Sequence, residues 1–242
     1  MNKFLSQINI KSIGKIGQEK IHKTSIALVG LGGLGSPILD YLSAAGIGCL
    51  KIIDDDIIEI SNLSRQLIYN IHDIDEAKID IAEKRAKLLN KDINIEKHFI
   101  RLNDSNINKI LKDDDIIVDA SDNFKTRYLL NQFCHDNAKI LVSGSAIKMQ
   151  GYLSVYKSGL DKLQPCFSCF HNIDDKYHER SCVNDGALGP VVGVIGCMMA
   201  TEVIKEITMP DKSIAGDLIY YNAETNRFKT IKLAKRNDCI CG

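Results

Sequence analysis

Hydrophobic and polar residues form two kinds of block over the first 150 residues. Short apolar runs of strand length alternate with longer segments in which apolar residues recur at helical spacing. The expected strands cover residues 26–29, 48–53, 94–100, 116–120 and 140–143, and the expected helices cover 12–24, 76–90 and 121–137. Strands that alternate with helices are typical of an α/β fold, so we predict a Rossmann-like, doubly wound and mostly parallel sheet.

The pattern changes beyond residue 150, where short strands follow one another closely. The expected strands cover 151–156, 217–222 and 227–233, and one apolar helix covers 190–207. We expect these strands to extend the same sheet in antiparallel fashion rather than to form a second domain. The sequence therefore predicts a single domain over 1–242, with an antiparallel extension at 151–242.

The charge balance and the lengths of the apolar stretches argue against nucleic acid and membranes as partners. The chain carries 31 Lys and Arg against 31 Asp and Glu, and this balance argues against a surface that follows nucleic acid. The first residues lack the apolar segment of a signal peptide, and the longest apolar stretch, 191–200, is about half of a bilayer span. We therefore expect no membrane contact and a cytoplasmic location, where the eight cysteines serve as metal ligands, nucleophiles or buried thiols.

A glycine-rich turn follows the first expected strand. Gly30, Gly32 and Gly35 have the spacing G-x-G-x-x-G, with Gly33 between them, and a helical pattern begins after them. Such a turn lets backbone N–H groups approach a phosphate at the positive end of the helix dipole. It predicts that residues 1–150 form a nucleotide-binding half, although the glycine spacing alone also fits an ordinary tight turn.

Charged residues after the second expected strand suit a nucleotide. Asp54 follows Gly30 by 24 residues, close to the spacing at which dinucleotide folds place a carboxylate on the ribose. Arg65 offers a guanidinium that bridges two phosphate oxygens, and Lys78 offers a charge for an attacked phosphate. The plainer interpretations are a solvated turn for the aspartates at 54–56 and an ordinary surface lysine for Lys78.

Asp122 follows the strand expected at 116–120 and is therefore expected at the carboxyl edge of the sheet, where ligands of such folds bind. A carboxylate that faces phosphates needs a cation between them, which implies Mg²⁺. Ser121, Asp122 and Asn123 also suit the N-cap of the next helix, so a capping role stays open for Asp122.

Five ordered motifs resemble the E1-like (ThiF-type) adenylyltransferases. They are the glycine turn, the aspartate-rich strand end, residues 59–66 (Glu-x-Ser-Asn-Leu-x-Arg-Gln), Lys78 and residues 119–123 (Asp-x-x-Asp-Asn). The chain looks most like the bacterial enzymes that activate small sulfur-carrier proteins for thiamine or molybdopterin biosynthesis. In that family, the terminal carboxylate of a ubiquitin-like carrier ending in Gly-Gly attacks the α-phosphate of ATP. The products are an acyl adenylate and pyrophosphate.

The resemblance implies a role for each matching residue. Those expected to bind ATP are Gly30, Gly32, Gly33, Gly35, Asp54, Ser61, Asn62, Arg65, Lys78, Asp122 and Asn123, with Mg²⁺ on Asp122. Those expected to act in catalysis are Arg65, Lys78, Asp122 and Cys182. No general base is required, because a carboxylate is already ionised at neutral pH.

Cysteines form two close pairs, Cys166 with Cys169 and Cys239 with Cys241. Four thiolates in two pairs suit tetrahedral Zn²⁺, and the resemblance implies a structural zinc here. The family usually has Cys-x-x-Cys as its second pair, whereas this chain has Cys-x-Cys. A degenerate site with spare thiols is therefore the alternative.

Cys182 precedes a Gly-x-x-Gly-Pro motif at 186–190. The resemblance places it in a loop that crosses above the active site, where some members form a covalent bond with the carrier. Arg180 nearby would favour the thiolate. The alternative is a small residue packed at the start of a helix.

Two features bear on activity and assembly. The family usually opens with Arg-Tyr-x-Arg-Gln, whose second arginine reaches into the phosphate site of the partner subunit, and here Ser6 replaces it. Gly193, Gly196 and Ala200 allow close packing of the helix at 190–207, which indicates either the family's homodimer or burial in the core. The rival functions are a nicotinamide dehydrogenase, a tRNA-modifying relative and a catalytically weakened binding protein.

Overall fold

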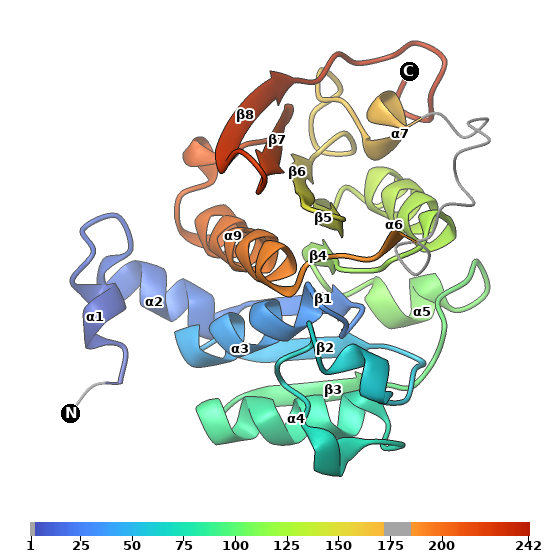
Figure 1. The fold of residues 1–242 in the computed structure, drawn as a ribbon. Coiled ribbons are helices and arrows are strands. Elements are labelled where there is room, and N and C mark those ends of the chain that lie inside the picture. Colours follow the sequence, from blue (N-terminus) through green and yellow to red (C-terminus); the bar gives the residue numbers. More distant parts are fainter. Residues whose placement is uncertain (1–2, 172–184) are drawn as a thin grey trace.

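The computed structural model describes residues 3–171 and 185–242, which form one eight-stranded sheet with helices on both faces (Figure 1). The strands are β1 (Ser25–Val29), β2 (Cys49–Ile53), β3 (Asn94–His98), β4 (Ile116–Asp119), β5 (Ile140–Ile147), β6 (Gln150–Tyr156), β7 (Asp217–Asn222) and β8 (Arg227–Lys232). The helices are α1 (Leu5–Ile8), α2 (Gly14–Lys23), α3 (Gly35–Ala45), α4 (Lys78–Leu89), α5 (Ile107–Leu111), α6 (Phe124–Asp136), α7 (Phe167–Phe170) and α9 (Gly189–Thr208). The short 3₁₀ turns are η1 (Ile60–Asn62), η2 (Ile71–Asp73) and η4 (Pro210–Lys212).

The sheet has the order β3-β2-β1-β4-β5-β6-β7-β8. The strands from β3 to β5 in this order are parallel, and β6, β7 and β8 continue from β5 in antiparallel pairs. The predicted parallel sheet with an antiparallel extension is therefore confirmed. β2 and β4 lie on opposite sides of β1, so the order in which strands are added to the sheet reverses at β1. α/β folds bind their ligands at such a point.

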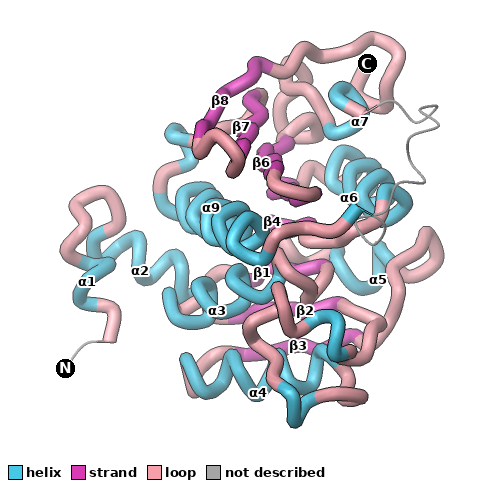
Figure 2. Tube along the Cα trace, in the orientation of Figure 1, coloured by secondary structure: helices cyan, strands magenta, loops and turns pink. Residues whose placement is uncertain are grey.

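Two hydrophobic cores fill the layers between the sheet and its helices. On one face, α2, α3, α4 and α9 pack around Ile38, Leu42 and Ile195, which are fully buried. On the other face, α5, α6 and α7 pack around Leu111 and Phe167. Figure 2 shows the two sets of helices on opposite sides of the strands.

Some element bounds differ from the predictions for local reasons. The helix predicted at 121–137 begins at Phe124, because the Asn123 side chain accepts a hydrogen bond from the Thr126 amide (2.9 Å) and caps it. The strand predicted at 140–143 is longer, because β5 pairs with β6 as far as Ile147. The short helices α1, α5 and α7 were not predicted, since four or five residues show no helical period.

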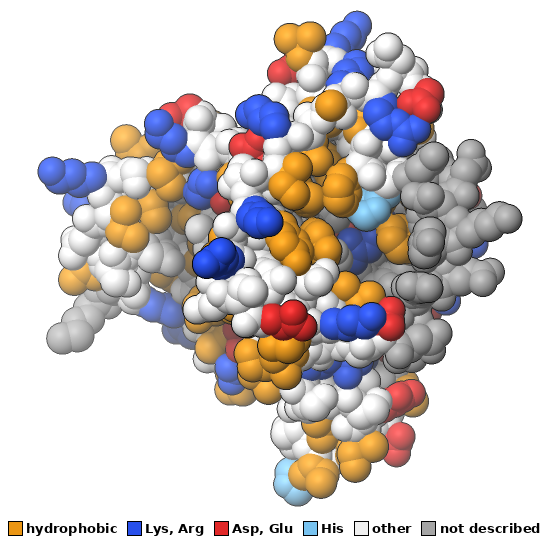
Figure 3. Space-filling model, turned by 45° about the horizontal axis from the view of Figure 1, so that its top comes forward, with side chains coloured by type: hydrophobic (Ala, Val, Ile, Leu, Met, Phe, Trp, Pro, Cys, Tyr) orange, Lys and Arg blue, Asp and Glu red, His pale blue; other side chains and the backbone are white. Residues whose placement is uncertain are grey.

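The surface agrees with the balanced charge of the chain. Lys and Arg side chains lie scattered among Asp and Glu on the face shown in Figure 3, without a continuous basic stripe over the described residues. No helix in the part of the chain that the structure describes is long and apolar enough to cross a membrane.

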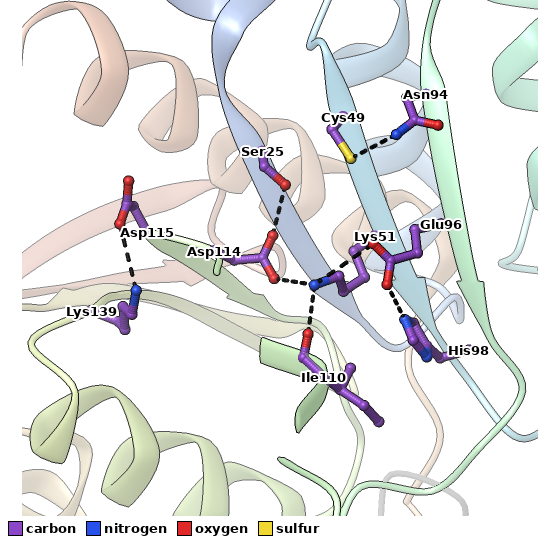
Figure 4. Close-up of polar contacts among 10 residues, drawn as sticks. All are labelled: Ser25, Cys49, Lys51, Asn94, Glu96, His98, Ile110, Asp114, Asp115 and Lys139. Carbon is purple, nitrogen blue, oxygen red and sulfur yellow. Dashed lines mark hydrogen bonds and ion pairs between the residues drawn. The ribbon is translucent and has the colours of Figure 1, made fainter. Parts of the chain in front are cut away.

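A buried ion pair joins several elements of the sheet (Figure 4). Lys51 in β2 has a side chain only 6% exposed, and its Nζ is 2.8 Å from Oδ2 of the fully buried Asp114. The ammonium also donates to the Ile110 carbonyl (2.5 Å), and Asp114 accepts a hydrogen bond from the Ser25 hydroxyl (2.8 Å). These contacts fix β1, β2, α5 and the approach to β4 relative to one another.

Removal of one residue of this ion pair should lower the free energy of unfolding more than removal of both. Lys51→Met leaves the Asp114 carboxylate uncompensated, and we expect a loss of about 3–5 kcal/mol in the free energy of unfolding. Lys51→Met/Asp114→Leu should recover most of this loss, because no unpaired charge stays buried. Denaturant unfolding measures both values.

Lys139→Met is the matched control for that experiment. Its partner Asp115 is 91% exposed, so the variant should lose less than about 1 kcal/mol. Equal losses for Lys51→Met and Lys139→Met would contradict the importance of the buried pair.

Candidate active site

A cavity of about 250 Å³ opens at the carboxyl edge of the parallel strands. Its walls include Val29 and Ile53, the last residues of β1 and β2, and Ala120, which follows β4. These segments meet because parallel strands end on the same side of a sheet. The predicted site residues in its walls are Gly30, Gly32, Gly33, Asp54, Arg65, Lys78, Asp122 and Asn123.

Three of the residues predicted to bind ATP, Gly35, Ser61 and Asn62, do not line this cavity. Gly35 is the first residue of α3. The buried Asn62 side chain accepts a hydrogen bond from the Glu59 amide (3.2 Å), and the Ser61 hydroxyl donates to the Glu59 carboxylate (3.2 Å). Ser61 and Asn62 thus shape the loop that carries Arg65, and their contact with a nucleotide stays a prediction.

The glycines of the turn serve two purposes. Gly30 has a φ of +95°, and a Cβ there would lie 2.7 Å from the Ala120 carbonyl oxygen. A Cβ on Gly35 would clash with the Gly30 carbonyl, so Gly30 and Gly35 allow close backbone packing. Among the described residues, a Cβ on Gly32 would meet only the Gln66 amide, at 3.7 Å. Gly32 therefore leaves open space on the cavity side of the turn, where a phosphate can approach the backbone.

Backbone amides hold Asp54 at the end of β2. Its carboxylate accepts hydrogen bonds from the Leu31 amide (2.7 Å) and the Asp56 amide (2.9 Å). Burial raises the pKa of Asp54 above its ordinary value, and Lys78 acts in the opposite direction. Each carboxylate oxygen keeps a further lone pair, which can accept a hydrogen bond from a hydroxyl in the cavity. Asp54 is therefore more than part of a solvated turn.

Lys78 is not an ordinary surface lysine. It is the first residue of α4, its side chain is 5% exposed, and its Nζ lies 2.7 Å from Oδ2 of Asp56. Arg65 lines the same cavity, and its guanidinium donates to the Ser61 carbonyl (3.0 Å). Two cations in the walls of one cavity suit a ligand with several negative charges.

Asn123 provides the N-cap of α6, which leaves Asp122 without a capping role. Asp122 is exposed in the cavity wall and makes no hydrogen bond or ion pair with any described residue. Mg²⁺ is usually bound by one or two carboxylates together with phosphate oxygens. The Asp122 carboxylate fits that requirement.

Sequence reasoning missed several residues of the cavity. Asp56, Gln66, Arg101 and Arg127 line it as well. The apolar residues in its walls include Val29, Ile53, Ile100, Leu102 and Ala120. The end of the strand predicted at 94–100 was a usable signal for Arg101, because a parallel neighbour ends at the same edge. Arg127 gave no such signal, since its place depends on how α6 is turned.

The four paired cysteines come together at α7 and the C-terminal segment. Their sulfur atoms are 3.2–3.9 Å apart in the five pairs within hydrogen-bond range, and all four lie within 4.8 Å of one another. A tetrahedral zinc with bonds of about 2.3 Å separates its sulfur ligands by about 3.8 Å. Cys239 and Cys241 lie 3.2 Å apart, so the shorter Cys-x-Cys spacing still brings both thiols into the cluster.

The remaining cysteines and the N-terminal segment have other surroundings. Cys134 is buried, whereas Cys49 and Cys197 are partly exposed, and Cys182 lies outside the described residues. Ser6 is exposed on α1, and the Lys3 ammonium donates to the Leu89 carbonyl at the end of α4.

Gly196 allows α9 to pack against α3. A Cβ at this glycine would lie 2.5 Å from the Pro37 ring and 2.7 Å from the Leu34 carbonyl oxygen. A Cβ at Gly193 would have no neighbour within 4 Å among the described residues. Gly196 thus serves internal packing, whereas Gly193 lies on a part of the helix that no other described residue covers.

Comparison with known proteins finds relatives along the whole chain. The ThiF family model matches residues 4–241. The sulfur carrier protein adenylyltransferase of Thermus thermophilus is 35% identical over 246 residues, which cover 100% of this chain and 91% of that protein. The SAMP-activating enzyme E1 of Haloferax volcanii is 34% identical over 244 residues, which cover 100% of this chain and 89% of that protein.

Longer relatives and solved structures complete the comparison. The adenylyltransferase and sulfurtransferase MOCS3 of Caenorhabditis briggsae is 37% identical over 99% of this chain, but the chain spans only 60% of its length. Escherichia coli MccB with succinimide has a TM-score of 0.85 over 100% of this chain and 74% of that one. Escherichia coli MccB with ATP has a TM-score of 0.81 over 94% and 68%. At 20% and 22% identity, these likenesses show the fold alone.

Alanine substitutions at two positions of the glycine turn should distinguish a glycine that close backbone packing requires from a glycine that borders open space. Gly35→Ala forces a Cβ against the Gly30 carbonyl, and we expect a loss of about 1–3 kcal/mol in the free energy of unfolding. Gly32→Ala has room for its methyl group, so its change should stay below about 1 kcal/mol. Urea unfolding of both variants measures the difference, and a larger loss for Gly32→Ala would contradict this division.

Proposed function

The chain belongs to the ThiF family, and we propose that it uses ATP to adenylate the C-terminal glycine carboxylate of a small ubiquitin-like sulfur-carrier protein. The names of the Thermus and Haloferax relatives, which it matches over most of their length, support this activity. The observation that carries the proposal is the meeting of Gly32, Asp54, Arg65, Lys78 and Asp122 in one cavity.

The cavity has a suitable surface for each part of ATP. The Asp54 carboxylate would accept hydrogen bonds from the ribose hydroxyls, and the apolar residues at 100–102 and at the ends of β1 and β2 would contact the base. The triphosphate would lie over Gly32 and Gly33, within reach of Arg65 and Lys78. These placements leave the α-phosphate open to a carboxylate that enters from solvent.

The reaction needs alignment and charge screening rather than a base. The carboxylate oxygen of the carrier would bond to the α-phosphorus while the bond to the β-phosphate oxygen breaks, and pyrophosphate would leave with the electron pair. Both reactants are anionic, so cations in the walls lower their repulsion. Lys78 would exchange its ion pair with Asp56 for a phosphate oxygen. Arg65 would stabilise the charge that develops on pyrophosphate.

Two metal ions belong to this proposal. Asp122 would hold Mg²⁺, which supplies further neutralisation of the phosphates when it is bound. Cys166, Cys169, Cys239 and Cys241 would hold Zn²⁺ as a structural clamp, because four gathered thiols have the donor set and spacing of such a site. The clamp would join α7 to the C-terminal segment.

The partners and the location are also proposals. We infer that the protein acts in the cytoplasm as a homodimer and that its carrier serves thiamine or molybdopterin biosynthesis. The thiolate of Cys182, which lies outside the described residues, would attack the acyl adenylate of the carrier and form a thioester as AMP leaves. The second candidate is a catalytically weakened relative, favoured by Ser6 at the position of the family's arginine. Carrier-dependent release of pyrophosphate would exclude it.

Arg65→Ala should impair chemistry more than carrier binding. Loss of one charge-stabilising donor is expected to slow carrier-dependent ATP–pyrophosphate exchange by about 10²–10³-fold. Calorimetry should show carrier affinity within about threefold of the original value, a loss worth less than 1 kcal/mol. Arg85→Ala is the matched control, because Arg85 pairs with Asp40 outside the cavity and should leave the exchange unchanged. Equal losses of exchange and carrier affinity would count against Arg65 as a catalytic group.

The cysteine cluster should retain one zinc ion per chain after purification. Cys239→Ser is expected to lower zinc affinity by about 10-fold or more and to reduce the thermal midpoint, because one of four thiolates is lost. Native mass spectrometry and elemental analysis measure the bound zinc. Cys197→Ser is the control, since Cys197 lies on α9, and it should retain the metal. Full zinc occupancy in Cys239→Ser would overturn the assignment.

A further inference from the structure

Arg127 is a buried cation beside the candidate active site. It lies in the first turns of α6 and lines the cavity, yet only 7% of its surface is exposed. The loop before it, residues 120–123, carries Asp122 from the end of β4 to the start of α6. Arg127 therefore follows shortly after the loop that presents Asp122.

The contacts of Arg127 run to the backbone and to a buried carboxylate. Its Nη2 donates to the Ser121 carbonyl, and its Nη1 lies 3.9 Å from Oδ2 of Asp119. Asp119 is fully buried and accepts hydrogen bonds from the Ser121 amide (3.1 Å), the Ser121 hydroxyl (2.6 Å) and the Ser143 hydroxyl (2.8 Å). Arg127 and Asp119 thus hold the backbone of Ser121, Arg127 at its carbonyl and Asp119 at its amide.

The neighbouring segments leave the loop little freedom. The glycine turn presses against it at Ala120, where even a Cβ on Gly30 would find no room. Asn123 closes the other end through its bond to the Thr126 amide. Asp122 itself has no polar partner among the described residues. Its orientation is therefore set by the backbone of the loop alone.

We propose that Arg127 is a positioning residue that fixes the 120–123 loop, so that the Asp122 carboxylate faces Mg²⁺–ATP in a preset orientation. This inference rests on the proposed function. Arg127 acts through Ser121 rather than on the substrate, because its guanidinium is already committed to the Ser121 carbonyl and Asp119. Lysine cannot replace it, since a single ammonium cannot span both acceptors as the planar fork does.

The test compares Arg127→Lys, Arg127→Met and Lys125→Met as full-length proteins. Lys125 is an exposed residue of the same helix, so its variant controls for loss of a positive charge. Calorimetry gives the ATP affinity with Mg²⁺ and with EDTA. Mg²⁺ should increase the ATP affinity of the original protein and of Lys125→Met. In both Arg127 variants this increase should be at least fivefold smaller. The ATP affinity of these variants in EDTA should stay within twofold of that of the original protein.

Hydrogen exchange in the absence of nucleotide supplies a second reading. Amide exchange in residues 118–124 should rise at least tenfold in Arg127→Lys, while the amides of β1 and β2 keep their protection. Arg127→Lys retains the charge, so it remains informative if Arg127→Met does not fold. An undiminished Mg²⁺ effect, or faster exchange throughout the sheet, would overturn the positioning role. Absent carrier-dependent pyrophosphate exchange in the original protein would instead refute the proposed function.

Discussion

The parallel arrangement of β1, β2 and β4 is the constraint on which the site depends. It brings the glycine turn, the Asp54 strand end and the Asp122 loop to one edge, although Gly30 and Asp122 lie far apart in the sequence. The buried pair of Lys51 and Asp114 fixes the same strands from within the sheet. The positions of the residues in the cavity wall are thus set by strand pairing and by a buried ion pair that lies outside the cavity.

Three of the cations in the cavity wall are held by carboxylate or carbonyl oxygens of the protein itself. Lys78 is held by Asp56, Arg65 by the Ser61 carbonyl, and Arg127 by Asp119 and the Ser121 carbonyl. Cations held in this way keep their positions without a ligand, which lowers the reorganisation needed when an anion binds. The Asp122 carboxylate has no polar partner among the described residues, which leaves it available to a metal ion.

Much of this architecture follows from the sequence because its signals are local. Apolar periodicity predicted the strands of the sheet and its long helices, and the order of Gly30, Asp54 and Asp122 indicated one ligand edge. The cysteine spacing predicted a cluster that the fold assembles. Other features depend on tertiary packing, which periodicity does not encode. Arg127 reaches the cavity only because of the rotation of α6 about its own axis. Ser61 and Asn62 bond to Glu59 within their own loop and do not line the cavity wall.

The identity of the reaction is tested most directly by the mass of a carrier protein after incubation. A ubiquitin-like protein ending in Gly-Gly is mixed with this protein, ATP and Mg²⁺, and intact-mass spectrometry follows the carrier together with its nucleotide products. We expect the carrier to gain one adenylyl group at its terminal glycine with release of one pyrophosphate, and to gain none when that glycine is deleted. Formation of ADP, or a gain that persists without the terminal glycine, would contradict it.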